Sequence, residues 1–412
     1  MLIPANAELI LRSLEEAGHE AYIVGGCVRD ALLGREPQDW DITTSALPEQ
    51  VQALFRRTID TGIQHGTVTV MFGKEAYEVT TYRIDGEYHD GRHPDQVTFT
   101  RSLEEDLKRR DFTINAMAYN PKRGLVDLFG GQKDLAERVI RAVGDARERF
   151  SEDALRMLRA VRFAGQLGFA IEEGTLAGIR ALAPTLAKIS QERIREELTK
   201  LLLSPQPELL ETAIDTGMTA VILPEADQVR ASLPEAYRAI RALREEALSE
   251  REMCALHYAL VFAGAGGACE VCRRLKFDNE SVQMTKMLAD NEAFAYTGQL
   301  PEIRRLLHRL GQENVRILFA FQRAAAAGRD DADRLRNISL GEEACRQVLA
   351  AGDCYELKDL AVSGADLIAA GFAPGKALGQ TLNRLLDAVM DDPARNQREQ
   401  LLAMAREEKI QG

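Results

Sequence analysis

The chain contains few cysteines and few aromatic residues. It has six cysteines and one tryptophan among 412 residues, and aromatic residues make up 6% of the total. Only Cys269-x-x-Cys272 brings two cysteines close together in the sequence, and the second ligand pair that a zinc site of this kind needs is missing. Because the flanking residues are typical of a helix, we expect no metal or redox role for these two cysteines.

The sequence also lacks a signal peptide, a lipidation motif and any apolar run long enough to cross a membrane. These absences predict a chain that works in the reducing environment of the cytoplasm. We therefore expect no membrane partner.

Positive charge does not dominate the composition. The 52 Lys and Arg residues are outnumbered by 64 Asp and Glu residues, which gives a formal net charge of −12. This balance excludes a protein coated in basic residues for bulk nucleic-acid binding. Two local basic stretches, at 108–110 and 138–162, could still form a positive groove for RNA. Solvated helix faces are the alternative explanation for both stretches.

Strand signals are confined to the N-terminal third of the chain. A helix is expected over 6–17 with Asn6 as its cap, and a strand is expected over 20–24. Residues 66–72 and 76–82 alternate as the two strands of a hairpin do. We expect these strands and their helices to form a mixed sheet.

Helical periods dominate the rest of the sequence. Residues 104–116 are predicted to return to helix, and from about Glu137 strand signals stop. The fold class is therefore α+β, with a sheet-containing first part and an all-helical remainder. The predicted parts are 1–136, 137–203, 204–300 and 301–412.

Two adjacent glycines follow the first predicted strand. Gly25 and Gly26 let the backbone come close to a ligand, and amides at a helix start can bind phosphate oxygens. Arg29, one turn further along, adds a charged fork suited to phosphate. Neither a Walker loop nor a Rossmann fingerprint is present. The stretch therefore predicts a phosphate site of another type.

Two aspartates lie just beyond this stretch. Residues 39–42 are predicted to form a strand on which Asp39 and Asp41 share one face, while Trp40 faces a core. Two like charges so close repel each other unless a cation lies between them, and hard oxygen ligands suit Mg²⁺. Glu78, on the second hairpin strand, becomes a third carboxylate if that strand lies beside Asp41. An ordinary exposed strand glutamate is the alternative.

Together these residues resemble a known family. The string Gly25-Gly26-x-Val28-Arg29-Asp30-x-x-Leu33-Gly34 with Asp39-x-Asp41 is similar to that of polymerase-beta-type nucleotidyltransferases. More narrowly, it resembles the class II group of tRNA CCA-adding enzymes and bacterial poly(A) polymerases. The resemblance implies a catalytic head, neck, body and tRNA-binding tail for the four parts. It also implies that Asp39 and Asp41 hold two Mg²⁺ ions and that Glu78 is catalytic.

A second motif of this family matches residues 109–116. The string Arg109-Arg110-Asp111-Phe112-Thr113-x-Asn115-Ala116 places Arg110 as the side chain expected to bind the triphosphate. Asp111 and Asn115 are expected near the sugar. A structural role is the alternative for each of the three residues, and for Asp111 it is an equal one. Residues 84–96, rich in turn formers and charge, are predicted to form a mobile loop that helps to reorganise the site between C and A addition.

A third motif lies on a predicted helix over 151–164. Ser151 is a natural helix cap, and this alone explains the acids in the first turn. Asp153, Arg156, Arg159 and Arg162 nevertheless repeat every three residues and form one ridge. Asp153 as acceptor and Arg156 as donor would select cytosine and adenine, which carry an exocyclic amine, over uracil and guanine.

The resemblance adds roles for the remaining residues of this ridge. It implies that Arg159 and Arg162 contact the nucleotide. The sequence Glu192-Arg193-x-x-x-Glu197 fits the family's E-R-x-x-x-E helix, which we interpret as a structural brace. Gly26, Arg29 and Arg110 complete the expected nucleotide-binding set.

The expected function is template-independent addition of C, C and A to a tRNA that lacks this 3′ end. ATP and CTP are the expected substrates, and pyrophosphate is the leaving group. A poly(A) polymerase, or an enzyme that adds only CC or only A, is the nearest alternative. A non-catalytic RNA-binding protein on the same scaffold is a third, which the intact Asp39 and Asp41 disfavour. The oligomeric state is left open, with a homodimer as one arrangement.

Overall fold

The computed structural model describes residues 1–86, 97–243, 246–263 and 267–411. The chain forms two compact units. The first comprises Met1–Arg230 with Arg273–Phe277, and the second comprises Ala231–Cys272 with Asp278–Gly412. The finer division at 136, 203 and 300 stays a prediction.

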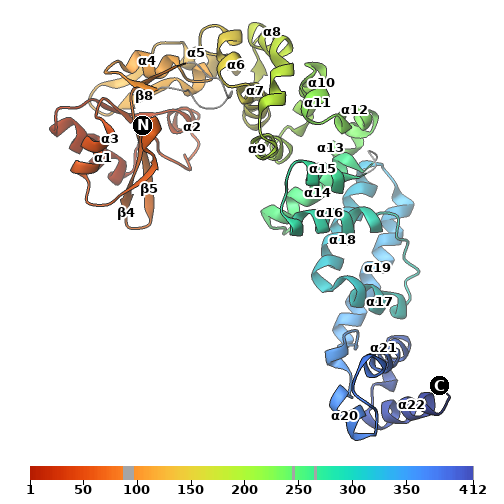
Figure 1. Ribbon diagram of the computed structural model, residues 1–412. Helices are drawn as coiled ribbons and strands as arrows, with labels where there is room; N and C mark the ends of the chain where they lie inside the picture. The colour runs from red at the N-terminus through yellow and green to blue at the C-terminus, as the bar shows by residue number, and fades with distance from the viewer. Residues whose placement is uncertain (87–96, 244–245, 264–266, 412) are drawn as a thin grey trace. The chain divides into compact units, whose positions relative to one another are not determined.

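The first unit is built on a mixed seven-stranded sheet with the order β3-β4-β5-β2-β1-β8-β9. Strand β2 pairs parallel with β5, whereas the other neighbours in this sheet pair antiparallel. The labelled strands lie in the red-to-orange part of the chain (Figure 1). The sheet strands are β1 (Ala21–Val24), β2 (Ile42–Thr44), β3 (Thr58–Gly62), β4 (Thr67–Phe72), β5 (Glu75–Thr81), β8 (Met117–Asn120) and β9 (Gly124–Asp127).

The hairpin that the alternating pattern predicts is present. Strands β4 and β5 pair in register from Thr67↔Thr80 to Phe72↔Glu75. Gly73 at the turn has a φ of 63°, which a glycine adopts without strain. The mixed sheet and the mainly helical remainder confirm the predicted α+β class.

A second, two-stranded sheet flanks the predicted loop. Strand β6 (Arg83–Asp85) pairs antiparallel with β7 (Val97–Phe99). Residues 87–96 between them lie outside the described part of the chain, so the predicted mobility of 84–96 is untested there.

Helices flank the seven-stranded sheet and continue through the rest of the first unit. Helix α2 begins the nucleotide-binding region, the 109–116 motif directly follows α4, and α7 and α9 carry the arginines and glutamates of the later motifs. These helices are α1 (Ala5–Glu16), α2 (Gly26–Leu32), α3 (Pro48–Leu54), α4 (Leu103–Lys108), α5 (Gly131–Glu137), α6 (Ala146–Glu152), α7 (Leu155–Leu167), α8 (Glu173–Leu182), α9 (Gln191–Leu202), α10 (Leu210–Asp215), α11 (Met218–Ile222) and α12 (Glu225–Gln228).

The sequence pattern predicts that strands stop near Glu137, but the structure has two short strands beyond this residue. Strand β10 (Val139–Ile140) pairs parallel with β11 (Ala170–Ile171) and ties the two ends of the segment that contains α6 and α7. Each strand has two residues. Such short strands leave no alternating pattern for a sequence window to detect.

Two predicted helix features are also wrong. Asn6 does not cap α1, because Pro4 occupies the N-cap position and makes no side-chain cap. The helix expected over 104–116 ends at Lys108, and a short 3₁₀ turn follows at Thr113–Asn115. The predicted helix is interrupted because Phe112, whose φ is −128° and ψ is 149°, is extended.

The second unit consists of helices, of which α15 (Ala268–Arg274) ends within the first unit. Two apolar clusters stabilise it, one around Tyr296 and Leu307 and the other around Leu385 and Leu401. The remaining helices are α13 (Leu233–Ala242), α14 (Glu250–Phe262), α16 (Asn279–Asn291), α17 (Leu300–Leu310), α18 (Gln312–Gly328), α19 (Ala332–Ala351), α20 (Gly364–Ala369), α21 (Lys376–Asp391) and α22 (Arg398–Gln411).

Cys269 and Cys272 are buried on α15 as free thiols. The Sγ of Cys272 lies 3.8 Å from the hydroxyl of Thr285, and burial raises the pKa of this thiol to about 12. Among the helices that the structure describes, none has the length and apolar character needed to span a membrane.

Candidate active site

The two glycines mark the point where β1 ends and α2 begins. Gly25 has a φ of 85° and is the N-cap residue of α2. A Cβ at this position would lie 3.2 Å from Nη1 of Arg110 and 4.0 Å from Oδ2 of Asp41. The glycine therefore permits both a left-handed backbone and the close approach of the Arg110 and Asp41 side chains to the chain at this turn.

Asp39 and Asp41 immediately precede β2 rather than lying on it. The strand begins at Ile42, so the predicted strand over 39–42 is wrong for its first three residues. Trp40 is only partly buried and does not enter a core as expected. The backbone amide of Val24 donates to the carbonyl of Asp41 at 3.0 Å, which fixes the aspartate beside the end of β1.

The sheet register brings Glu78 to the same place. Ile42 on β2 lies opposite Val79 on the parallel strand β5, so the residues before them, Asp41 and Glu78, are neighbours. Burial raises the pKa of Asp41 to about 6, with further increases from the charges of Glu78 and Asp39 and an opposing effect from Arg110. The structure thus places Asp41 within electrostatic reach of both other predicted carboxylates, Asp39 and Glu78.

These carboxylates have the chemistry that a hard divalent cation requires. In the described ranges no group of three or more His, Cys, Asp or Glu residues already has the geometry of a metal cage. Oxygen donors whose like charges raise a pKa nevertheless fit such a cation, because a bound cation would relieve their repulsion. The predicted metal ligands Asp39 and Asp41 therefore remain suitable on chemical grounds.

Arg110 faces Asp41 from the end of α4. Its Nη2 lies 3.4 Å from Oδ2 of Asp106, and its buried Nε has no hydrogen-bond partner among the described residues. Asp106 is fully buried and also accepts from Arg109 and Thr43. The guanidinium of Arg110 is thus close enough to Asp41 to lower its pKa, and it also contacts the buried carboxylate of Asp106.

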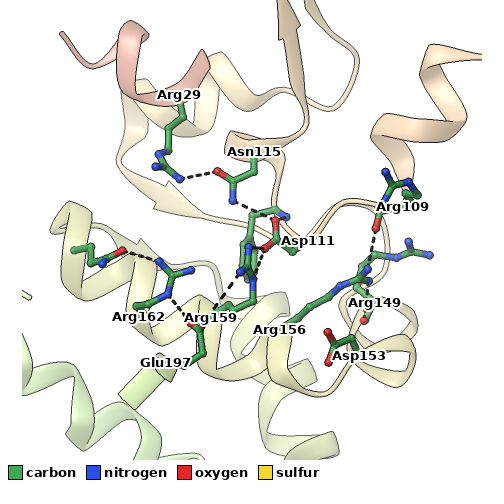
Figure 2. Close-up of polar contacts among 12 residues, drawn as sticks. Arg29, Arg109, Asp111, Asn115, Arg149, Asp153, Arg156, Arg159, Arg162 and Glu197 are labelled. Carbon is green, nitrogen blue, oxygen red and sulfur yellow. Dashed lines mark hydrogen bonds and ion pairs between the residues drawn. The ribbon is translucent and has the colours of Figure 1, made fainter. Parts of the chain in front are cut away.

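A polar chain connects α2 to α7 (Figure 2). Nη1 of Arg29 donates to Oδ1 of Asn115 at 2.8 Å, and Nδ2 of Asn115 donates to Asp111 at 3.2 Å. Nε of Arg159 donates to the other oxygen of Asp111 at 2.8 Å. Arg29 also pairs with Asp30. Arg29 and Arg159, predicted to bind the nucleotide, therefore lie in one network with Asp111 and Asn115, predicted to lie near the sugar.

Asp111 is ionised within this network. Burial alone would raise the pKa of its carboxyl, but the charge and hydrogen bond of Arg159, with Arg156 and Asn115, lower the pKa to about 2. The carboxylate therefore stays an acceptor at every pH at which the chain would work.

The other arginines of α7 are also anchored. Nε of Arg162 donates to Glu197 on α9 at 2.5 Å, and Arg159 lies 4.0 Å from the same carboxylate. Arg156 donates to Glu152 and to the backbone carbonyl of Arg109. The three arginines share α7 as predicted, and each is bound by protein acceptors. The single helix predicted over 151–164 is wrong, because it is interrupted at Asp153, which lies outside α7.

Asp153 lies between two helices rather than in the first turn of one. Helix α6 ends at Glu152, with Ser151 inside it, so the predicted Ser151 cap is wrong. Asp153 instead accepts from the amide of Leu155 at 3.0 Å, at the start of α7. Nη2 of Arg193 donates to its second oxygen at 2.8 Å. Arg193 and Glu197 on α9 thus act as the brace that the sequence predicted.

Sequence reasoning missed Asp106. The spacing offered a signal, since Asp106 precedes Arg109 and Arg110 by three and four residues, the separations at which helical side chains meet. Its complete burial and its bond from Thr43 on β2 depend on the tertiary fold and could not be read from spacing.

Three sequence families match successive parts of the chain. They are described as "Poly A polymerase head domain" at 21–141, "Probable RNA and SrmB- binding site of polymerase A" at 168–229 and tRNA nucleotidyltransferase domain 2 at 258–405. The chain is 40% identical over 406 residues to the CCA-adding enzyme of Limosilactobacillus fermentum, covering 97% of this chain and 96% of that protein. It is 37% identical over 416 residues to the CCA-adding enzyme of Enterococcus faecalis, covering 99% and 97%.

A solved structure gives the same relationship. The CCA-adding enzyme of Bacillus stearothermophilus in complex with CTP superimposes with a TM-score of 0.81 at 35% identity, covering 100% of this chain and 99% of that chain. The mixed-sheet head, which matches the poly(A) polymerase head-domain family, and the relatives that cover the whole chain define this protein as a nucleotidyltransferase. With full-length relatives at about 40% identity, the chain belongs to the family of class II CCA-adding enzymes. Members of this family generally use a divalent metal ion.

Proposed function

We propose that the chain adds C, C and A, without a template, to the 3′ end of tRNA that lacks them, using CTP and ATP. The observation that carries this proposal is the meeting of Asp39, Asp41 and Glu78 with Arg110 beside the turn at Gly25. Carboxylates that gather beside a cation and a glycine turn suit nucleotidyl transfer to a hydroxyl. The names of the full-length relatives support CCA addition over poly(A) synthesis.

Mg²⁺ is the proposed metal, and Asp39 and Asp41 are its proposed ligands. When bound, it would supply positive charge to the terminal RNA hydroxyl and to the leaving pyrophosphate. Glu78 lies beside Asp41 and is proposed as the third catalytic acid. Asp41, with a pKa raised to about 6, would gain most from the cation.

Arg110 and the start of α2 are proposed to bind the triphosphate. The unpartnered Nε of Arg110 leaves this guanidinium donor capacity near the carboxylates. Gly26 begins α2, where its amide is available to a phosphate oxygen. Arg29 is held by Asp30 and Asn115, so its proposed nucleotide contact would work together with them.

The base is proposed to lie against the beginning of α7. Asp153 is the proposed acceptor for the exocyclic amine of cytosine or adenine, and Arg156 is the proposed donor to the ring. Arg159 and Arg162 are proposed to contact the same nucleotide. Because Arg193, Arg109 and Glu197 hold these side chains in place, the contacts would be preorganised.

Incubation of the purified protein with tRNA lacking its 3′ end distinguishes the alternatives. CTP alone, ATP alone and both nucleotides together are supplied, and product length is read on a sequencing gel. A full enzyme adds CC from CTP alone and CCA from both. Addition stopping at CC with both nucleotides would indicate a CC-adding enzyme. A long A tract from ATP alone would indicate a poly(A) polymerase. If no product forms, the assay is repeated with tRNA ending in CC: addition of one A would then indicate an A-adding enzyme, and absence of product on both tRNAs would indicate a non-catalytic protein.

Two further expectations stay predictions. The oligomeric state, including a homodimer, is measured by light scattering in the presence and absence of tRNA. The cytoplasmic location is checked by cell fractionation.

A further inference from the structure

Asp106 is a completely buried carboxylate that the proposed mechanism does not use. Its exposed fraction is 0%. Burial alone would raise its pKa, but the charges of Arg109 and Arg110 and hydrogen bonds from Arg109 and Thr43 lower it. Burying a charged carboxylate costs free energy unless oppositely charged and hydrogen-bonding partners compensate for the lost water. The role of this buried charge therefore depends on what its partners do.

The partners of Asp106 come from two segments of the chain, strand β2 and the residues that directly follow α4. The hydroxyl of Thr43 on β2, two residues after Asp41, donates to Oδ2 at 3.0 Å. Arg109 donates to Oδ1 through Nε at 3.0 Å and Nη2 at 2.8 Å. Arg110 contacts Oδ2 through Nη2 at 3.4 Å. One carboxylate therefore links the strand that follows the catalytic aspartate to the arginine that faces it.

Arg110 has few other constraints in the described part of the chain. Its Nε is buried without a partner, and its Nη1 packs against Gly25, where a Cβ would be 3.2 Å away. Because Asp106 is the one carboxylate that forms an ion pair with it there, the direction of its guanidinium depends on that contact.

We propose that Asp106 is a positioning residue that aims Arg110 at the nucleotide triphosphate. The proposal rests on the proposed role of Arg110. Asp106 touches neither substrate nor metal in this scheme and acts through Arg110. CTP and ATP share the triphosphate. Removal of the Asp106 carboxylate should therefore weaken the binding of both nucleotides equally and leave the choice of base unchanged.

The test is a double-mutant cycle with steady-state kinetics on tRNA lacking its 3′ end. Asp106→Asn keeps the volume and removes the charge, and it should raise the KM for CTP and for ATP about tenfold. In an Arg110→Ala background the same change should have no further effect on KM, because the residue through which Asp106 acts is gone. Asp60→Asn, an exposed aspartate on β3, is the matched control and should change nothing.

The outcomes separate the inference from the proposed function. If Arg110→Ala leaves KM unchanged, the triphosphate role of Arg110 fails. If Arg110→Ala raises KM but Asp106→Asn only lowers kcat and melting temperature, or acts equally in both backgrounds, Asp106 is merely structural and the inference is overturned.

A milder variant keeps the test decisive if Asp106→Asn does not fold. Thr43→Val preserves the shape and removes one hydrogen bond from the carboxylate. It should raise KM for both nucleotides about threefold, again only when Arg110 is present. An unchanged KM in a folded Thr43→Val protein would count against the proposal.

Discussion

Two charged regions of the first unit differ in how their charges are balanced. Asp39, Asp41 and Glu78 form no ion pair with the described residues. Burial, with the added charges of Glu78 and Asp39, raises the pKa of Asp41 to about 6. On α7, by contrast, Arg159 and Arg162 are paired with carboxylates from two other segments. The carboxylate region therefore retains unbalanced charge for a ligand, whereas the arginine region is already satisfied by the protein.

This difference shows where binding energy is stored. Folding leaves the carboxylates in an unfavourable arrangement that a cation would relieve. The arginines are instead held in place at the expense of part of their donor capacity, which favours fixed geometry over strong attraction for any anion. Loss of a side chain should thus have opposite effects on stability in the two regions.

The largest effect is expected on activity at the carboxylates. Asp39→Ala and Asp41→Ala should each lower nucleotide transfer by at least about a thousandfold, because each removes a ligand from a small cation site. Initial rates with CTP and tRNA measure the loss, and circular dichroism checks the fold. Glu36→Ala, at an exposed acid on the same connection, is the control. Turnover at the wild-type rate in either aspartate variant would contradict the metal role.

The next largest effect is expected on stability at the arginines. Glu197→Gln should lower the free energy of unfolding by about 3–5 kcal/mol, because it leaves the buried guanidinium of Arg162 without its counter-charge. Denaturant titration measures the change. Glu196→Gln, at the exposed neighbour, should shift stability by less than about 0.5 kcal/mol. Equal effects of the two changes would mean that the ion pair between Glu197 and Arg162 does not stabilise the fold.

A change of the opposite sign is expected at Asp41. The pKa of this carboxyl is about 6 in the folded protein, above its ordinary value of 3.8, so ionisation destabilises the fold as pH rises through that range. Asp41→Asn should therefore raise the free energy of unfolding at pH 7.5 by about 1–3 kcal/mol without divalent cation. Melting curves from pH 4 to 8 measure it.

The pH dependence provides the control for this prediction. The stability advantage of Asp41→Asn should vanish below about pH 4, where the wild-type carboxyl is protonated, and Mg²⁺ should reduce it at pH 7.5 by stabilising the wild type. A lower melting temperature for Asp41→Asn at every pH would show that the carboxylates do not repel one another in solution.

Much of this comparison could be predicted from local sequence. The hairpin at Gly73 and the glycine turn at Gly25 follow from alternation and turn chemistry, which depend on neighbouring residues. The position of Asp41 outside β2 could not be predicted, since a strand boundary depends on pairing with β5. The anchoring of Asp153 by Arg193 joins residues 40 positions apart, and such pairs leave no short-range signal.

The smallest expected effect concerns Asp153, for which both a base-reading role and a structural role are possible. If its carboxylate reads the exocyclic amine, Asp153→Ala should raise UTP incorporation relative to CTP by about tenfold, since each good base contact contributes about 1–3 kcal/mol of discrimination. The structure also gives Asp153 a structural role, because it accepts from the amide of Leu155 and pairs with Arg193. Arg193→Gln breaks the ion pair but keeps the carboxylate, so it is the matched variant. If the role is structural alone, both variants lower the melting temperature and neither changes the CTP to UTP ratio. If Asp153 reads the base, Asp153→Ala changes the ratio far more than Arg193→Gln does at a similar loss of stability.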